Sequence, residues 1–162
     1  MLINRLDLLR CLQSTVKVLP TRGALTILSG VSLVAENNLF TMRASDLEVG
    51  VEVQAVCQGE LKTVLPGKFF LDVVSKLSGD TVEIALKETI AEIKCGRSNY
   101  KLSAIDYRDY PIFPEIEADP FIIPLAELKK AINQTLFATS QDETRGPLTG
   151  LCLDLEKKTL SA

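Results

Sequence analysis

Few side chains in this sequence suit catalysis or metal binding. The 162 residues contain no histidine, which excludes Ser-His and Cys-His nucleophiles, His-Glu-x-x-His zinc sites and the commonest general base. The four cysteines are far apart and form no Cys-x-x-Cys pair; they are Cys11, Cys57, Cys95 and Cys152. We therefore expect buried, reduced thiols rather than disulfides or zinc ligands, with no metal and no cofactor.

Three short motifs could be read as enzymatic sites, but the residues around each motif argue against that interpretation. Gly67-Lys68 lacks the earlier glycine and the following serine or threonine of a phosphate-binding loop, so it more simply begins a helix. Ser14-Thr15-Val16-Lys17 fits a Ser-x-x-Lys pattern, but it lies inside a predicted helix and no Lys-Thr-Gly follows it. Asp46-Leu47-Glu48 could form a metal corner, although a turn explains it more simply. No carboxylate pair is placed to hold two metals, so we expect no catalysis.

The remaining polar residues of interest lie on one side of predicted helices. Cations mix there with other polar groups at helical spacing: Arg10, Gln13, Ser14 and Lys17; Lys68, Asp72, Ser75 and Lys76; and Lys129, Lys130, Asn133 and Gln134. Such faces suit sequence-independent contact with DNA phosphates, but a merely solvated face explains them equally well. The net charge of −3 disfavours a nucleic-acid partner only weakly, because it does not say where the cations lie.

The elements that would position these residues follow a β-α-β-β-β order twice, which predicts an α+β fold. A strand over residues 2–4 precedes a helix over 6–18 with an apolar stripe. Further strands are expected over 31–35, 39–43, 47–56 and 61–65; a second helix over 68–77; and strands over 81–86, 89–95 and 100–104. A proline-rich segment over residues 110–120 then predicts a linker.

An internal repeat extends this pattern. Shifting the chain by 120 residues places its first 42 residues over its last 42 without a gap, so that Leu2-Ile3 faces Ile122-Ile123. The order of elements is the same in both copies: strand, helix, polar loop, strand and charged turn. This predicts a complete domain over residues 1–120 and the beginning of a second over 121–162, in a chain that we expect to be truncated. Two unrelated β-α units at a coincidental spacing are the alternative.

Several motifs resemble one known family. They are Thr21-Arg22-Gly23, Ile27-Leu28-Ser29-Gly30, Ser45-Asp46-Leu47-Glu48-Val49, Leu65-Pro66-Gly67-Lys68-Phe69-Phe70, the run from Cys95 to Ser103, Tyr110-Pro111, Phe113-Pro114, Thr144-Arg145 and Leu148-Thr149-Gly150. In this order they resemble the first domain, and the start of the second, of the bacterial DNA sliding clamp (the β subunit of DNA polymerase III).

The resemblance implies a fold, an assembly and a function. Members are built from three similar domains, with helices on the inner, DNA-facing side and sheets outside. Two subunits form a head-to-tail homodimer ring that encircles double-stranded DNA and tethers the replicative polymerase after a clamp loader has placed it. The ring is a replication processivity factor, and it is an accessory subunit without catalytic residues.

The resemblance also implies roles for particular residues. Arg22 matches an arginine that contacts DNA, and Arg10 and Lys68 match basic positions. The helix faces add Lys17 and Lys130 as expected DNA contacts.

The resemblance also assigns positions in the second domain and at the protein contacts. Gln141 is a further expected DNA contact, because it stands beside the position of a DNA-contacting glutamine that is aspartate here. Arg97, Tyr100 and Leu102 match the edge of the first domain that docks on the third domain of the other subunit. Leu148 matches one wall of the groove that captures polymerase and loader peptides, whose other walls are expected beyond Ala162.

The sequence lacks the signals of membrane insertion or secretion. No stretch approaches the ~20 apolar residues of a membrane span, and Arg5, Asp7 and Arg10 interrupt the apolar N-terminus. We therefore expect a cytoplasmic protein without a membrane partner. An alternative to the clamp is an α+β protein-binding module that never contacts DNA.

Overall fold

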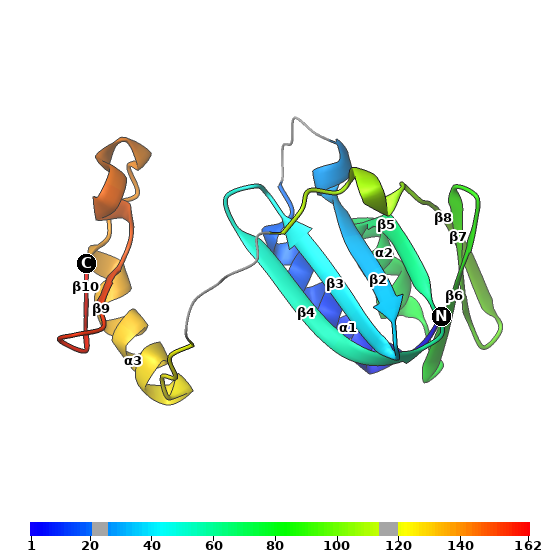
Figure 1. Cartoon of the computed structure of the whole chain (residues 1–162), viewed down its shortest axis with the longest axis horizontal. Coiled ribbons are helices and arrows are strands. Elements are labelled where there is room, and N and C mark those ends of the chain that lie inside the picture. The colour runs from blue at the N-terminus through cyan, green and yellow to red at the C-terminus, as the bar shows by residue number, and fades with distance from the viewer. Residues whose placement is uncertain (21–25, 114–119) are drawn as a thin grey trace. The chain divides into compact units, whose positions relative to one another are not determined.

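The computed structural model describes residues 1–20, 26–113 and 120–162 (Figure 1). The chain divides into two compact units, Met1–Pro114 and Glu115–Ala162, and each is described by itself. None of the described helices is long and apolar enough to cross a membrane.

The first unit has the β-α-β-β-β order twice, which confirms the expected α+β fold. Its first half contains β1 (Leu2–Asn4), α1 (Arg5–Thr15), the 3-10 turns η1 (Val16–Val18) and η2 (Thr26–Ser29), β2 (Gly30–Glu36), β3 (Leu39–Ser45) and β4 (Gly50–Gln58). Its second half contains β5 (Leu61–Pro66), α2 (Gly67–Lys76), β6 (Thr81–Lys87), β7 (Ile90–Cys95), β8 (Ser98–Ser103) and the 3-10 turn η3 (Tyr107–Asp109).

The ten described strands form two sheets, of which the larger lies in the first unit. Its order is β5-β2-β3-β4-β1-β6-β7-β8, and every neighbouring pair is antiparallel. Figure 1 shows α1 and α2 together on one side of this sheet. The sheet curves so far that β5 meets the chain after β8, where Val64 and Ile105 exchange two backbone hydrogen bonds of 3.0 Å.

The core lies between the two helices and the sheet. Alternate strand residues and one stripe of each helix are buried there, including Leu8 and Leu12 of α1, Phe70 of α2, Phe40 of β3 and Ile93 of β7. Each of these side chains is fully enclosed, which stabilises the fold by about 1.5–3 kcal/mol per large apolar side chain. The helices are therefore fixed against the sheet through their apolar stripes, and their opposite faces remain exposed.

Local signals set the ends of the first helix. The Asn4 side chain accepts hydrogen bonds from the backbone N–H groups of Leu6 and Asp7, at 2.9 and 3.3 Å, so it caps α1 at its start. The predicted helix over residues 6–18 is α-helical only to Thr15 and continues as the 3-10 turn η1. Thr15 is buried, and its hydroxyl donates to the Cys11 carbonyl at 3.0 Å.

A tight turn replaces the first part of one predicted strand. The strand expected over residues 47–56 begins only at Gly50, because the Asp46 carboxylate accepts hydrogen bonds from the N–H groups of Glu48 and Val49. Leu47 takes the left-handed conformation there, with φ of 82°. These hydrogen bonds lower the pKa of Asp46 below its ordinary value. The turn interpretation of this motif is thus correct.

The chain after β8 is tied back onto the sheet by aromatic residues. The Lys62 ammonium lies 5.5 Å from the Tyr107 ring centroid, and the Arg43 guanidinium lies 5.5 Å from the Phe113 ring centroid. A β-carbon at Gly50 would come within 2.9 Å of the Phe113 ring, so only glycine leaves room for it. The start of the predicted linker is therefore part of the first unit.

Tyr110 completes the ladder between β2 and β3. Ser32 pairs with Arg43, so the same register would place Gly30 opposite Ser45. The buried Tyr110 hydroxyl stands between these two, accepting from the Ser45 N–H at 3.2 Å and donating to the Gly30 carbonyl at 3.4 Å. Burial raises the pKa of this hydroxyl.

The second unit repeats part of the first with the same spacing. It contains α3 (Leu125–Thr135), the 3-10 turns η4 (Leu136–Ala138) and η5 (Glu143–Thr149), and a hairpin of β9 (Cys152–Asp154) and β10 (Thr159–Ser161). Helix α3 and turn η4 stand 120 residues after α1 and η1, and β10 starts 120 residues after β3.

Two expectations for this unit were wrong. Residues Ile122-Ile123 form no strand, and Cys152 is exposed whereas the other three cysteines are buried and free. In the first unit the matching strand β1 lies between β4 and β6, and no such neighbours exist among the described residues of the second. The sequence pattern is repeated, but the described residues of this unit do not include the strands that bury the pattern in the first unit.

We predict that Tyr110→Phe lowers the free energy of unfolding by about 1–2 kcal/mol, because it leaves the buried Ser45 N–H without an acceptor. Urea denaturation followed by circular dichroism measures this difference. Tyr107→Phe is the matched control, since the aromatic ring that meets Lys62 remains. Equal stability of the two variants would contradict this role of the Tyr110 hydroxyl.

Candidate nucleic-acid interface

Helices α1 and α2 run antiparallel, side by side on one face of the sheet. At one end, Arg5 donates from its Nε to the Gly79 carbonyl at 2.9 Å, which ties the start of α1 to the chain after α2. At the other end, a β-carbon on Gly67 would lie 2.4 Å from a methyl group of Leu19. Glycine at the start of α2 thus lets it approach the chain after α1, and the two exposed helix faces form one surface.

This surface, here called the helix face, carries more cations than carboxylates. Its cations are the exposed Arg10, Lys17, Lys68 and Lys76. Its carboxylates are the exposed Asp72 and the half-buried Asp7. Arg10 lies 3.5 Å from Asp7, and the two side chains are 78% and 45% exposed to water, so this ion pair is weak. The other three cations form no ion pair with any residue that the structure describes.

The cations on the opposite, outer side of the sheet are paired. Arg43 lies 2.6 Å from Glu52 across β3 and β4, and Lys62 contacts Glu36 across β5 and β2. Paired charges present a smaller field to an approaching polyanion than unpaired ones. On the helix face Lys17, Lys68 and Lys76 have no carboxylate partner among the described residues, whereas on the strands of the outer side each lysine or arginine lies near a carboxylate, which Lys87, Lys94 and Lys101 share.

The helix face is not wholly polar. Phe69 on α2 is 68% exposed, whereas its neighbour Phe70 is fully buried. Leu6 at the start of α1 is also exposed. Consecutive residues point about 100° apart on a helix, so only one of the two phenylalanines can face the sheet.

The structure describes five of the six expected DNA contacts, in two groups. Arg10, Lys17 and Lys68 share the helix face. Lys130 on α3 and Gln141 after η4 are exposed on the second unit. Arg22 lies outside the described residues.

The expected docking edge lies on β8, the last strand of the sheet. Arg97 is exposed in the turn between β7 and β8, Tyr100 is 38% exposed, and Leu102 is half-buried against the core. Strand β8 pairs with β7 alone in the described part of the chain. A row of backbone groups on β8 is thus open to another strand.

A charged cluster beside this edge was not predicted. Glu92 on β7 is buried on the outer side of the sheet, where its carboxylate lies 3.1 Å from Lys87, 3.8 Å from Lys101 and 4.0 Å from Lys94. The hydrogen bond from Lys87 is the main cause that lowers the pKa of Glu92, against the opposing effect of burial. Lys101 lies directly opposite Glu92 on β8, so the cluster fixes the edge strand to its neighbour.

The hairpin turn between β7 and β8 could have revealed this cluster. The β7–β8 turn places Cys95 opposite Ser98, and counting back from that pair brings Glu92 opposite Lys101. The expected strands over residues 89–95 and 100–104 did not include this register. The length of the turn, rather than the residue types, therefore held the information that predicts this cluster.

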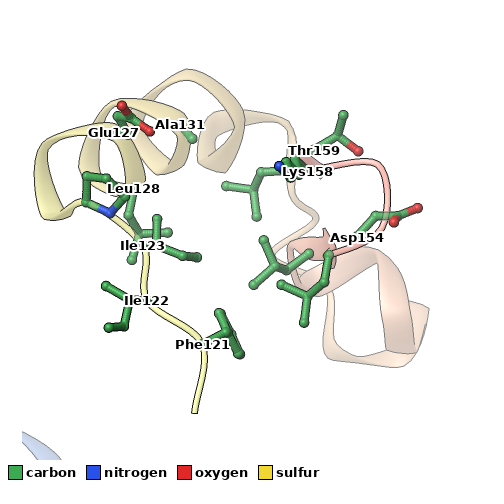
Figure 2. Close-up of a pocket in the computed structure, with 13 residues that line it drawn as sticks. Phe121, Ile122, Ile123, Glu127, Leu128, Ala131, Asp154, Lys158 and Thr159 are labelled. Atoms are coloured by element: carbon green, nitrogen blue, oxygen red, sulfur yellow. The ribbon is translucent and has the colours of Figure 1, made fainter. Parts of the chain in front are cut away.

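The second unit contains an open apolar groove of about 450 Å³ between α3 and the β9–β10 hairpin. Figure 2 shows Phe121, Ile122, Ile123 and Leu128 on one side of it, with Lys158 and Thr159 on the other. No residue of α3 is buried. Leu148, the expected wall of a partner groove, is 59% exposed in this unit, but it does not line the groove.

Nothing in the described residues resembles a catalytic centre. Within them, no three histidine, cysteine, aspartate or glutamate side chains are close enough to hold a metal ion. The charged residues of the apolar groove are Glu127, Asp154 and Lys158, and the Asp154 carboxylate accepts a hydrogen bond from the Lys157 N–H at 2.9 Å.

Comparison with known proteins decides the family. Residues 1–114 match the family model of the DNA polymerase III beta subunit, N-terminal domain. The chain belongs to this family. The beta sliding clamp of Staphylococcus epidermidis is 36% identical, and the match covers 86% of this chain and 40% of that protein. The beta sliding clamp of Staphylococcus aureus is 34% identical with the same coverage.

Solved clamp structures have the same fold. The DNA polymerase III subunit beta from Pseudomonas aeruginosa matches with a TM-score of 0.87 at 29% identity, covering 93% of this chain and 42% of that one. The sliding clamp from Bacillus subtilis matches with a TM-score of 0.87 at 31% identity, covering 93% and 43%. The clamp fold inferred from the motifs is thus confirmed, and the chain spans about 40% of the length of its curated relatives.

We predict that Glu92→Gln lowers the stability of this clamp-family chain at pH 7, because three lysines lose their shared carboxylate. The pKa of Glu92 is lowered in the folded state, so its contribution is present above the ordinary value near 4.5 and is lost as the pH falls through the lowered value. Thermal melts at pH 7 and pH 3 measure this.

Glu83→Gln is the control for this variant, because Glu83 is exposed on the same side of the sheet and forms no ion pair with a described residue. The difference between wild type and Glu92→Gln should be smaller at pH 3 than at pH 7, because protonation of Glu92 removes its contribution. A difference of equal size at both pH values would show that the cluster is not electrostatic.

Proposed function

We propose that this chain serves as part of a DNA sliding clamp, a processivity factor that encircles duplex DNA and tethers the replicative polymerase. The relatives named beta sliding clamp and the clamp fold support this proposal. The role is topological and needs no catalytic residue, so the chain is an accessory subunit and not an enzyme. A cytoplasmic location follows from that role.

The observation that carries the proposal is the difference between the two sides of the sheet. Lys17, Lys68 and Lys76 on the helix face lack ion-pair partners among the described residues, whereas the cations on the outer strands lie near carboxylates, which Lys87, Lys94 and Lys101 share. Unpaired cations on an exposed surface suit contact with DNA phosphates, and such contact carries no sequence preference. A clamp that slides requires this kind of contact.

The remaining expected contacts belong to the same proposal. Arg22, Lys130 and Gln141 extend the DNA-contacting set, and residues 121–162 begin a second clamp domain. The repetition of α1 and η1 by α3 and η4 after 120 residues supports that second domain.

Contacts with proteins complete the proposal. Arg97, Tyr100 and Leu102 form the edge at which clamp subunits meet as a homodimer ring. Leu148 belongs to a groove for the polymerase and the clamp loader, and its exposure of 59% is compatible with peptide binding.

We predict that neutralising the helix face with Arg10→Gln, Lys17→Gln and Lys68→Gln weakens binding to a duplex oligonucleotide about tenfold at low salt. Fluorescence anisotropy of a labelled duplex, repeated over a salt series, measures the affinity. The slope of log affinity against log salt should become shallower, because each lost phosphate contact removes about 0.9 from it.

The matched control neutralises three cations of the outer side, with Lys62→Gln, Lys87→Gln and Lys94→Gln. Both triple variants have the same net charge, so a difference between them reports position. Equal weakening would mean that DNA is attracted only by overall charge. Unchanged binding in the helix-face variant would favour the protein-binding module that does not contact DNA.

A further inference from the structure

An aromatic ring is exposed among the cations of the helix face. Phe69 is 68% exposed, which is more than any other large apolar side chain of α1 and α2. Elsewhere in the first unit, Tyr107 and Phe113 each lie 5.5 Å from a cation of the same unit. Within the described part of the chain, no cation lies in this way over Phe69. Its ring is therefore available to a stacking partner from outside the chain.

Lysines flank this ring along α2. Lys68 directly precedes it, and Lys76 follows two turns later on the same stripe of the helix, about 10 Å along the axis. Neither lysine forms an ion pair with a described residue. One exposed carboxylate, Asp72, lies between them, so the charge beside the ring is positive on balance.

The chain after α1 adds a third lysine near the start of α2. Gly67 approaches Leu19 so closely that a β-carbon on it would lie 2.4 Å from a leucine methyl group. Phe69 stands two residues after this contact, and the exposed Lys17 stands two residues before it. The ring and the three unpaired lysines therefore share one surface. We call it the aromatic patch: Lys17, Lys68, Phe69 and Lys76.

This combination of groups suits a single strand of DNA better than a duplex. In a duplex, both faces of each base are covered by neighbouring bases, so an aromatic side chain on a protein surface finds no base face to stack on. In a single strand the base faces are open, and they stack on aromatic rings while cations contact the phosphates. A duplex would thus use the lysines alone, whereas a single strand would use the ring as well.

We propose that the aromatic patch binds single-stranded DNA, with a base stacked on Phe69 and phosphates beside Lys17 and Lys68. Every base has a face that can stack, so this contact needs no sequence preference. A protein that accompanies a polymerase meets single-stranded template as well as duplex product. The inference rests on the proposed function and adds a second class of nucleic acid to the helix face.

Two substitutions separate the ring from its apolar character. Phe69→Leu keeps an exposed apolar side chain without the ring, whereas Phe69→Tyr keeps the ring. Fluorescence anisotropy of the full chain at low salt measures the affinity for a labelled thymidine oligonucleotide of about 16 nucleotides. The same measurement is made on the duplex that this oligonucleotide forms with its complement. Circular dichroism confirms that each variant is folded.

We expect Phe69→Leu to weaken binding of the single strand about tenfold and to leave binding of the duplex unchanged. Phe69→Tyr should bind both forms as wild type does. Leu6→Ala is the matched control, because Leu6 is an exposed apolar residue at the other end of the helix face, with 51% of its surface exposed. This control should change neither affinity.

The sequence contains no tryptophan, which allows a direct test of stacking. Phe69→Trp introduces a single indole, whose fluorescence is quenched when a base stacks on it. The single strand should quench this emission and the duplex should not. Leu6→Trp places the indole at the other end of the helix face, where we expect no quenching by either form.

Three results would overturn the proposal. The first is equal weakening of both forms of DNA by Phe69→Leu, and the second is unchanged binding of the single strand with no quenching of Phe69→Trp. The third is a loss of self-association in Phe69→Leu with unchanged DNA binding, which would assign the ring to a protein contact. The helix-face and outer-side triple variants retain Phe69, so failure of the proposed function would appear in them and is distinguishable from failure of this inference.

Discussion

Three residues, Leu2–Asn4, hold the two halves of the sheet together. Strand β1 pairs with β4 on one side and with β6 on the other, and α1 begins at the next residue. The position of the first helix therefore depends on a strand of only three residues, with Ile3 buried in the core. Helix α2 follows β5 in the β4 half and leads to β6 in the other half, so both helices are positioned by the way in which β1 joins the halves.

The two sides of the sheet differ in whether their cations have carboxylate neighbours, and this difference does not follow from the overall composition of the chain. Cross-strand neighbours lie about 5 Å apart, which lets carboxylates on the outer side of the sheet neutralise the lysines and arginines opposite them. Residues on the helix face have no such facing strand, and apart from the weak Arg10–Asp7 pair their cations stay unpaired among the described residues. An acidic protein can thus present a cationic surface to duplex DNA, because a ligand responds to the local field and not to the net charge.

Much of this organisation could be predicted from the sequence, for reasons that differ between elements. The repeated β-α-β-β-β order and the cations of Arg10, Lys17 and Lys68 follow from hydrophobic periodicity, which is local information. The exposure of Phe69 and the cluster around Glu92 depend on helix orientation and strand register, which residue type alone does not specify. The second unit was predicted least well: Ile122-Ile123 forms no strand and Cys152 is exposed, because a strand needs neighbours as well as a pattern.

The most direct test of the central claim is an amide chemical-shift titration of the isotope-labelled chain with a short DNA duplex at low salt. The account predicts that the largest shifts lie along α1 and α2, around Arg10, Lys17 and Lys68, and that they disappear at high salt. Shifts confined to the outer strands or to the apolar groove of the second unit, or no shifts at all, would contradict the assignment of the helix face to DNA.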